Sequence, residues 1–510
     1  MYKVMKKSIA LLVCCIMLFY MASCGGESNT SIKDTLTVAA ITDYGNLDSM
    51  NQGTDLLNIA REIAQPLLKI NPNGEIEWIL ATGMDWDLDN LKLTIHLREG
   101  VTFSNGNPFN ADDYLFTLDR FENTPGRTKF FPAMDSTNMK KIDDYTIELT
   151  LLEYDFTMVQ NFGTLYAIYA ESFDEEEYAV NPIGTGPYIL EEYVINSHVY
   201  LKRNENYWGE PAKIPNLRFK YLAEPAQRVN ALETGEVDCA NIPLQDIDYV
   251  SSFPGVRIET KQLAQVTTAI LNFTDYSTLN SVEARYAVCH AIDRQAIVDL
   301  VYNGYGKVSD YPSSSFSLDY DPRWSNLNDT YAIGYDPDLA REYAEKAGII
   351  GKDIVIITNG TSNFVAVAEI VQQNLRDIGL NPIINNYDAA AMRTIGNDPT
   401  MFDIYINDRG APSRNSAQVL WAFVKVIPYV AEGQWPGHDR YMELIDQVMG
   451  IPDKQERSDV LLEMNQIIAD AALWYSLCDY ESAYAIPDTI DGFVFNTLSS
   501  FNYNEWSYRQ

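Results

Sequence analysis

Side chains that could perform catalysis or bind a metal are scattered in this sequence. None of the four histidines has a second candidate ligand at the spacing that places two ligands on one helix or strand. These histidines are His96, His198, His290 and His438. No Gly-x-Ser-x-Gly elbow, His-Glu-x-x-His pair or cysteine–histidine nucleophile signature occurs. We therefore expect no enzymatic activity, no metal centre and no cofactor.

The start of the chain has the composition of an export signal. Three lysines precede an apolar run over residues 9–20, which is shorter than the ~20 apolar residues that span a bilayer. The run is followed by Met21, Ala22, Ser23 and Cys24, which resemble the bacterial lipoprotein box. We expect a signal peptide over residues 1–23, acylation of Cys24 including palmitate, and a lipid-anchored tether over residues 24–33. The alternative is an apolar helix that stays in the membrane.

Acidic side chains outnumber basic ones by 71 to 37, which gives a formal net charge of −34. Removal of residues 1–23, which hold three lysines and no acid, changes this charge to −37. Proteins that coat nucleic acid need a basic surface, so this class is excluded. The negative charge also repels anionic lipid, so the acyl chains must hold the protein at the membrane. The same field favours cationic or zwitterionic solutes.

Hydrophobic periodicity predicts a mixed α/β fold. Apolar side chains alternate along residues 91–97 and 145–151, which is typical of half-buried strands. Asn110 is expected to cap a helix between these strands, and a second helix is expected from Asn280 to about Val301.

Later in the chain, a strand over residues 354–357 is followed by a polar loop over 358–363 and a helix over 366–378. A further strand over 382–385 completes a predicted βαβ unit.

Two groups of residues are interpreted as structural. Cys239, Cys289 and Cys478 are too widely spaced for a disulfide framework, so we expect them to be buried apolar residues. Gly184 and Gly186 suit a tight reversal in which two stretches of backbone pass close together.

Eight segments, taken in order, carry a resemblance to a known family. They are LKLTIHLREGVTFSNGNPFNADDYLFTLDR (91–120), NPIGTGPYIL (181–190), LKRNENYWGEP (201–211), RVNALETGEVD (228–238), ARYAVCHAIDRQAIV (284–298), YDPDLAREYAEKAG (335–348), the loop around Asp408, and LWYSLCDYESAYAIPDTIDGF (473–493). The series resembles family 5 of the bacterial extracellular solute-binding proteins, the oligopeptide-, dipeptide- and nickel-type receptors of ABC importers. It covers essentially the whole chain after the predicted signal.

The resemblance implies an α/β, two-lobed periplasmic-binding-protein-like fold of type II, cluster C, with an extra inserted α+β domain. Domain I is expected to be discontinuous, and domain III is expected to close over it about crossings near Leu271 and Tyr475. The expected boundaries are 34–56, 181–270 and 475–510 for domain I, 57–180 for domain II, and 271–474 for domain III.

The resemblance also implies ligand-binding residues. In peptide-binding relatives, an aspartate in a loop after a strand pairs with the ligand's ammonium group, and Asp408 falls at the matching position. Tyr405 and Ala411 replace the tryptophan and the second acid that are usual there. Dipeptide-type members place an arginine in the loop equivalent to residues 358–363, where this chain has none.

Strict dipeptide capture is therefore disfavoured unless Arg393 or Arg409 reaches the ligand, and longer peptides or a non-peptide solute fit better. The remaining candidates for the binding site are Asn407, Tyr44, Asn46, Tyr387, Trp421 and Trp435.

We therefore predict a monomeric, lipid-anchored receptor on the outer face of the cell membrane that delivers peptides to an ABC permease. The alternatives are a receptor for a non-peptide solute, such as a nickel complex or an oligosaccharide, and a sensor or scavenger lipoprotein that does not import.

Overall fold

The computed structural model describes residues 33–51, 54–71, 75–124, 131–410, 415–494 and 501–509. The predicted signal peptide, Cys24, most of the predicted tether and Ala411 lie outside these residues. No helix within the described ranges combines the length and the apolar character needed to cross a membrane.

A four-stranded sheet has the order β1-β10-β9-β8, in which β9 runs antiparallel to both β10 and β8. Its strands are β1 (Thr35–Ala40), β10 (Asn216–Tyr221), β9 (His198–Arg203) and β8 (Tyr188–Val194). The core beneath it is completed by apolar residues of α2 (Thr54–Ile63).

The Gly184-Thr-Gly186 reversal lies against the end of α2. A Cβ atom on Gly184 would lie 2.2 Å from the carbonyl oxygen of Ile63, and one on Gly186 would lie 2.4 Å from that of Glu62. The prediction of a close backbone approach at these two glycines is confirmed.

A second four-stranded antiparallel sheet has the order β4-β5-β7-β6. Its strands are β4 (Ala81–Asp87), β5 (Lys92–Leu97), β7 (Thr146–Leu151) and β6 (Met134–Asp143). Burial alternates along β5 and β7, as their sequences predict. Asn110 caps α3 (Ala111–Asn123): its side chain accepts from the backbone N–H of Asp112 at 2.8 Å, and Asp113 accepts from the backbone N–H of Asn110 at 3.0 Å.

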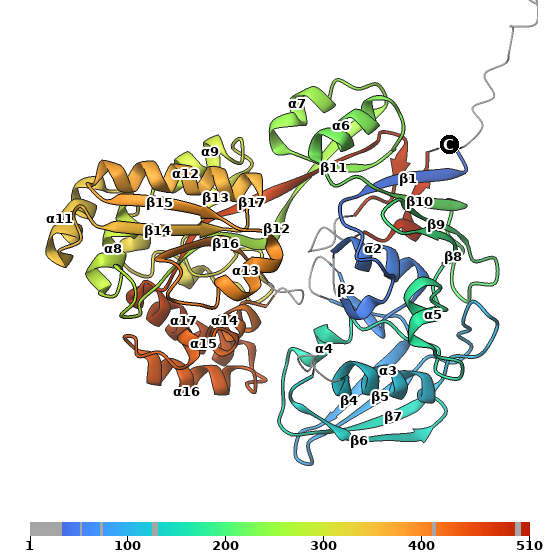
Figure 1. Cartoon of the computed structure of the whole chain (residues 1–510). Coiled ribbons are helices and arrows are strands. Elements are labelled where there is room, and N and C mark those ends of the chain that lie inside the picture. Colours follow the sequence, from blue (N-terminus) through green and yellow to red (C-terminus); the bar gives the residue numbers. More distant parts are fainter. Residues whose placement is uncertain are drawn as a thin grey trace, which may run out of the picture. The chain divides into compact units, whose positions relative to one another are not determined.

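The largest sheet has seven strands, in the order β11-β17-β12-β16-β14-β15, with β13 paired to β17 (Figure 1). The strands are β11 (Ala240–Ile242), β17 (Trp474–Pro487), β12 (Val256–Leu271), β16 (Ile404–Gly410), β14 (Asp353–Thr358), β15 (Asn381–Asn386) and β13 (Gly306–Val308). β14 runs parallel to both β15 and β16. With α12 (Ser362–Asp377) between β14 and β15, this arrangement confirms the predicted βαβ unit, although the loop before α12 is shorter than expected.

Helices cover both faces of this sheet (Figure 1). One face packs against α8 (Val282–Ala291), α9 (Arg294–Leu300), α11 (Pro337–Ala347) and α12. The other packs against α14 (Ser416–Val426), α15 (Pro428–Ala431), α16 (His438–Val448) and α17 (Lys454–Ala471). The remaining helices and short strands are α4 (Met158–Asn161), α5 (Glu175–Val180), α6 (Pro225–Glu233), α7 (Ile247–Val250), α10 (Asp329–Ala332), α13 (Ala389–Ile395), β2 (Leu68–Ile70), β3 (Ile76–Trp78), β18 (Ile490–Asp491) and β19 (Ser507–Tyr508).

The prediction of one helix from Asn280 to Val301 is wrong, because the chain breaks between α8 and α9. Ile292 is extended, with φ −80° and ψ 116°. Asp293 then caps α9 by accepting a hydrogen bond from the backbone N–H of Ala296 at 2.9 Å. The break directs the side chain of Arg294 into the interior, where it donates to the backbone carbonyl of Ser309.

β12 and β17 are unusually long, at 16 and 14 residues. β17 pairs with β11 and with β13 along different parts of its length, and β12 pairs with β16 towards its end. Their mutual register shifts between Gln262 and Val266. The large sheet thus contains strands from the predicted domains I and III. The sheet of β1, β10, β9 and β8 lies within the predicted domain I, and the sheet of β4, β5, β7 and β6 lies within the predicted domain II. The division into three domains stays a prediction.

Candidate functional site

Asp408 lies near the end of β16, opposite Thr267 of β12. Its carboxylate accepts hydrogen bonds from the hydroxyl of Thr267 at 2.9 Å and from the hydroxyl of Tyr480 at 2.6 Å. We expected this aspartate in a loop, and that expectation is wrong. The ladder between β12 and β16 continues as far as Gly410, so Asp408 is held within a strand.

Two tyrosines support this carboxylate. Tyr302 and Tyr480 stack with ring centroids 4.7 Å apart and planes 16° from parallel. The hydroxyl of Tyr302 is 2.7 Å from that of Thr267. A continuous set of hydroxyl groups therefore orients the Asp408 side chain before any ligand arrives.

The Asp408 carboxylate has no cationic partner among the described residues. Burial raises its pKa to about 6, although the hydrogen bonds from Tyr480 and Thr267 act in the opposite direction. Asp48 contrasts with it, because Arg120 donates to the Asp48 carboxylate at 2.6 Å. A desolvated carboxylate without a counter-ion is unfavourable. Asp408 is thus suited to receive a cationic group.

Arg409 follows Asp408 and points to the opposite face of the sheet, because adjacent residues of a strand alternate. Its Nε atom is buried and has no hydrogen-bond partner within the described part of the chain. Burial lowers the pKa of the guanidinium, whereas interaction with the phenols of Tyr405 and Tyr429 acts in the opposite direction. The strand therefore presents opposite charges on its two faces.

Asp479 is a buried acid that the sequence reasoning did not single out. It lies on β17 opposite Val266, which also pairs with Arg409 of β16. Asp479 is fully buried, its carboxylate accepts from the hydroxyl of Ser315 at 3.1 Å, and burial raises its pKa to about 6. The only signal in the sequence was an acid within the otherwise apolar segment that begins at Leu473.

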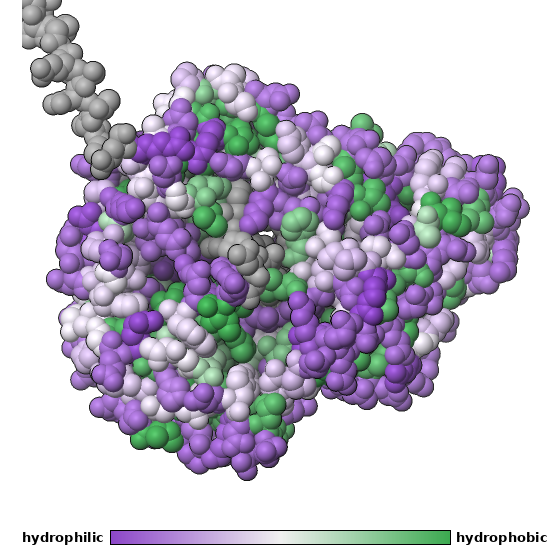
Figure 2. Space-filling model, turned by 180° about the vertical axis from the view of Figure 1, so that it is seen from behind, coloured by the Kyte–Doolittle hydropathy of each residue, from purple (hydrophilic) through white to green (hydrophobic). Residues whose placement is uncertain are grey.

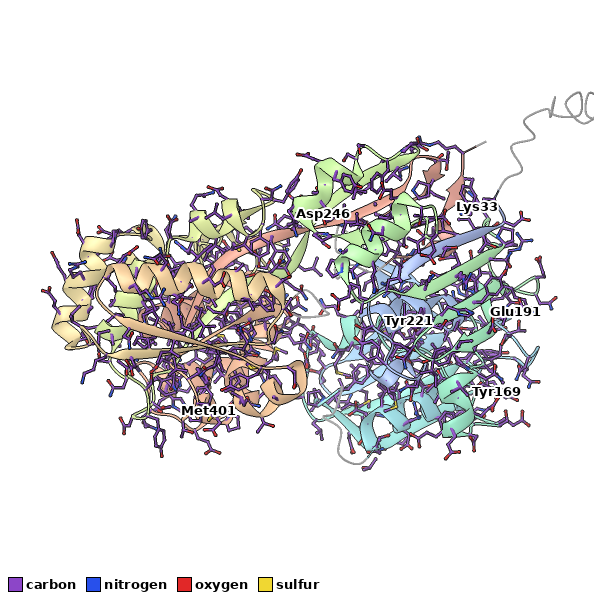
Figure 3. All side chains as sticks on the ribbon, turned by 45° about the horizontal axis from the view of Figure 1, so that its top comes forward. Lys33, Tyr169, Glu191, Tyr221, Asp246 and Met401 are labelled. Carbon is purple, nitrogen blue, oxygen red and sulfur yellow. The ribbon has the colours of Figure 1, made fainter. Side chains whose placement is uncertain are left out.

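Three other predicted residues lie on or near β16. Tyr405 packs against Phe402 with ring centroids 6.0 Å apart. Asn407 is buried, with its amide oxygen 3.5 Å from the hydroxyl of Thr268. Tyr387 packs against a small apolar cluster that also includes Phe402. Met401, labelled in Figure 3, lies shortly before this strand.

The remaining candidates are not brought to Asp408 by any described contact. Tyr44 is exposed, and Asn46 accepts a hydrogen bond from the backbone N–H of Asp48 within the loop after β1. Trp421 packs in the apolar cluster formed by α14, α16 and α17. Trp435 lies in the same cluster, is 5% exposed and donates to the carbonyl of Val430 at 3.0 Å. The role of Trp435 in ligand binding stays a prediction, and its indole N–H is already bonded.

The side chain of Arg393 lies outside the described residues. The three cysteines Cys239, Cys289 and Cys478 are buried, as the sequence predicts, and no disulfide joins them.

No group of three potential metal ligands occurs among the described residues. His96 contacts Asp85 at 2.8 Å and His198 contacts Glu192 at 3.1 Å, both as isolated pairs. His290 is buried, with Nδ1 2.8 Å from the carbonyl oxygen of Gly334. Figure 2 shows a largely hydrophilic face with separate apolar patches.

Comparison with known sequences decides the family. The profile of the bacterial extracellular solute-binding proteins, family 5, matches residues 75–426. The chain belongs to this family. Its members are solute-binding proteins rather than enzymes, and they act outside the cytoplasm, in the periplasm or at the cell surface.

Individual relatives agree with this assignment. Di/tripeptide-binding protein 3 from Pseudomonas aeruginosa is 29% identical over 353 residues, and the match spans 61% of this chain and 64% of that protein. The nickel-binding periplasmic protein from Escherichia coli is 26% identical over 415 residues, which are 75% of this chain and 77% of that protein.

Among solved structures, the fold is similar to the ABC transporter-associated periplasmic binding protein DppA from Helicobacter pylori in complex with the peptide STSA. The TM-score is 0.79 at 22% identity, and the match covers 94% of this chain and 99% of that chain. The predicted two-lobed type II fold is confirmed.

Proposed function

We propose that this family 5 protein is the receptor of an ABC importer and captures peptides by pairing the ligand's ammonium group with Asp408. The observation that carries the proposal is the desolvated Asp408 carboxylate, held by two hydroxyl groups and without a cationic partner in the described chain. The names of the Pseudomonas aeruginosa di/tripeptide-binding relative and of the Helicobacter pylori peptide complex support a peptide ligand.

We further propose that the ligand is an oligopeptide rather than a dipeptide. The connection between β14 and α12 is short and contains no arginine, so it offers no guanidinium fork for a dipeptide's carboxylate. Longer peptides can instead be held by hydrogen bonds to their main chain.

Closure of domain III over domain I would convert binding into transport. A permease that recognises the closed form imports only when ligand has stabilised that form. Lipid at Cys24 would keep the monomeric receptor close to the permease despite its acidic charge. The sequence feature that supports anchoring is the resemblance of residues 21–24 to a lipoprotein box.

The test is isothermal titration calorimetry on the purified protein with pools of dipeptides, tripeptides and longer peptides. Each pool is matched by the same peptides with an acetylated amino terminus. We expect binding of the longer peptides with a free ammonium group and at least a tenfold loss on acetylation, about 1.4 kcal/mol. Absence of binding to every pool would refute a peptide ligand. Equal binding of free and acetylated peptides would remove Asp408 from the proposed role.

Mass spectrometry of ligand that co-purifies with the protein separates the alternatives. A bound peptide supports the proposal, whereas a nickel complex or an oligosaccharide would favour a non-peptide receptor. Disruption of the permease separates import from a sensor role, because only an importer loses peptide uptake when the permease is absent.

A further inference from the structure

The segment that follows β7 makes contacts outside its own sheet. Tyr154 stays attached to that sheet, because its ring packs edge-to-face on Trp86 of β4 with ring centroids 5.3 Å apart. Phe156, two residues later, packs instead against the apolar cluster formed by α14, α16 and α17. Its backbone N–H donates to the carbonyl oxygen of Met449, at the end of α16, at 3.1 Å. The segment therefore joins two parts of the fold that lie far apart in the sequence.

Arg457, near the start of α17, completes the surface that receives the Phe156 ring. Its guanidinium lies 3.9 Å from the centre of this ring, within the range of a cation–π contact. The same guanidinium donates to the carbonyl oxygens of Ile451 at 2.6 Å and Pro452 at 3.3 Å. Arg457 is thus positioned by the connection between α16 and α17, independently of Phe156.

Two further interactions shape the contact around Phe156. The Asp155 carboxylate accepts hydrogen bonds from the backbone N–H of Thr157 at 2.8 Å and from its hydroxyl at 2.7 Å, and so holds the turn that carries Phe156. Gln160, on α4, accepts a hydrogen bond from the side-chain amide of Asn415, the residue that precedes α14. The contact therefore combines a backbone hydrogen bond, a side-chain hydrogen bond and a cation–π pair.

The two sides of this contact belong to different predicted domains. Residues 154–160 lie in the predicted domain II, and residues 415–457 lie in the predicted domain III. Domain II is inserted in domain I, so the two are expected to move together. Movement of domain III about the expected crossings near Leu271 and Tyr475 would separate the two sides, and it would therefore break the contact.

We propose that Phe156 is a latch that fastens the predicted domain II to the predicted domain III and favours the closed form of the receptor, with or without ligand. The proposal rests on the proposed function, in which ligand is held by closure. It gives the inserted domain a role in ligand retention that requires no contact with the ligand. A contact made only in the closed form raises the closed fraction, and the apparent affinity for a ligand that requires closure rises with that fraction.

The first experiment uses no peptide and measures the radius of gyration by small-angle X-ray scattering. The wild type is compared with Phe156→Ala and with the matched control Phe173→Ala. Phe173 is also half-buried, and the Arg120 guanidinium lies 4.8 Å from the centre of its ring, but both residues belong to the predicted domain II. We expect a larger radius of gyration for Phe156→Ala and the wild-type value for Phe173→Ala. A wild-type radius of gyration for Phe156→Ala would overturn the proposal.

The second experiment measures the binding of tetra-alanine by calorimetry. We expect Phe156→Ala to bind about tenfold more weakly than the wild type, and Arg457→Ala about threefold more weakly. The double variant should bind no more weakly than Phe156→Ala, because both substitutions remove the same contact. Phe156→Tyr keeps the ring and should bind like the wild type, as should Phe173→Ala. Wild-type affinity of Phe156→Ala, or additive effects of the two substitutions, would overturn the proposal.

The two experiments separate failure of the latch from failure of the proposed function. If no peptide binds the wild type, the proposed function fails, and the scattering result alone decides the latch. If peptides bind but Phe156→Ala neither expands nor binds more weakly, the latch fails and the proposed function stands. Should Phe156→Ala not fold, Arg457→Gln takes its place in both experiments, because it leaves the Phe156 ring in the chain and removes its cationic partner.

Discussion

The raised pKa of Asp408 predicts that ligand affinity depends on pH. Burial moves this pKa from 3.8 to about 6. At ~1.4 kcal/mol per pKa unit, the shift corresponds to at most ~3 kcal/mol of unfavourable free energy for the ionised empty site, and to less than this in proportion to the exposed part of the side chain. A bound ammonium group offsets this free energy, because it stabilises the ionised form.

The sign of the pH dependence follows from which form binds. Above pH 6 the carboxylate is ionised and binds ammonium at full strength; below pH 6 the proton competes with the ligand. Affinity for peptides with a free amino terminus should therefore fall about fivefold between pH 6 and pH 5, and the decrease should approach about tenfold per pH unit below pH 5. The ligand-free protein should show the opposite trend, with stability lost as pH rises through 6.

Calorimetry at several pH values between 5 and 7.5 measures this slope. Asp408→Asn should bind at least tenfold more weakly than the wild type at pH 7, and its affinity should not vary over this range. Asp479 is a demanding control, because burial raises its pKa to about 6 as well. Asp479→Asn should keep the wild-type slope. A wild-type affinity that is constant from pH 7.5 to pH 5, or a slope that persists in Asp408→Asn, would refute the reasoning.

Three further predictions concern the stability of the fold. Gly186→Ala should lower the free energy of unfolding in urea by about 3 kcal/mol or more, because its Cβ would clash with backbone, whereas Gly83→Ala should have little effect because nothing lies within 4 Å of its Cβ position. Burial raises the pKa of Glu62 to about 8, so wild-type stability should decrease as pH rises from 5 to 9 and Glu62→Gln should remove this decrease in denaturant titrations. The Arg457 guanidinium lies 3.9 Å from the centre of the Phe156 ring, so Arg457→Ala should lose about 1 kcal/mol of stability; an unchanged urea midpoint would contradict that contact.

Strands with one buried face were predictable from the sequence, because their side-chain pattern is local. β5 and β7 follow their apolar alternation closely. The break between α8 and α9 was missed, although Asp293 is a favourable helix cap and supplied a signal. The apolar residues on either side kept a helical spacing, and this spacing concealed the break.

The candidate site was less predictable than the fold, because it depends on pairing between distant segments. Asp408 was found by resemblance, but its place within a strand depends on Thr267, 141 residues earlier in the chain. Tyr429 and Asp479 carry no motif of their own. Their proximity to the site follows from helix packing and from the register of β12 with β17, neither of which can be read from local sequence.

The long pairing of β12 with β17 links the bending of these two strands to the hydrogen bonds that hold Asp408. Thr267 on β12 and Tyr480 on β17 donate the two hydrogen bonds that hold Asp408, and both lie close to the register shift that begins after Gln262. Bending of the ladder at this irregularity would move both donors relative to the carboxylate at the same time. The pKa of Asp408 would then depend on the curvature of β12 and β17. Residues of these strands that never contact a ligand could therefore change the affinity of the protein for that ligand.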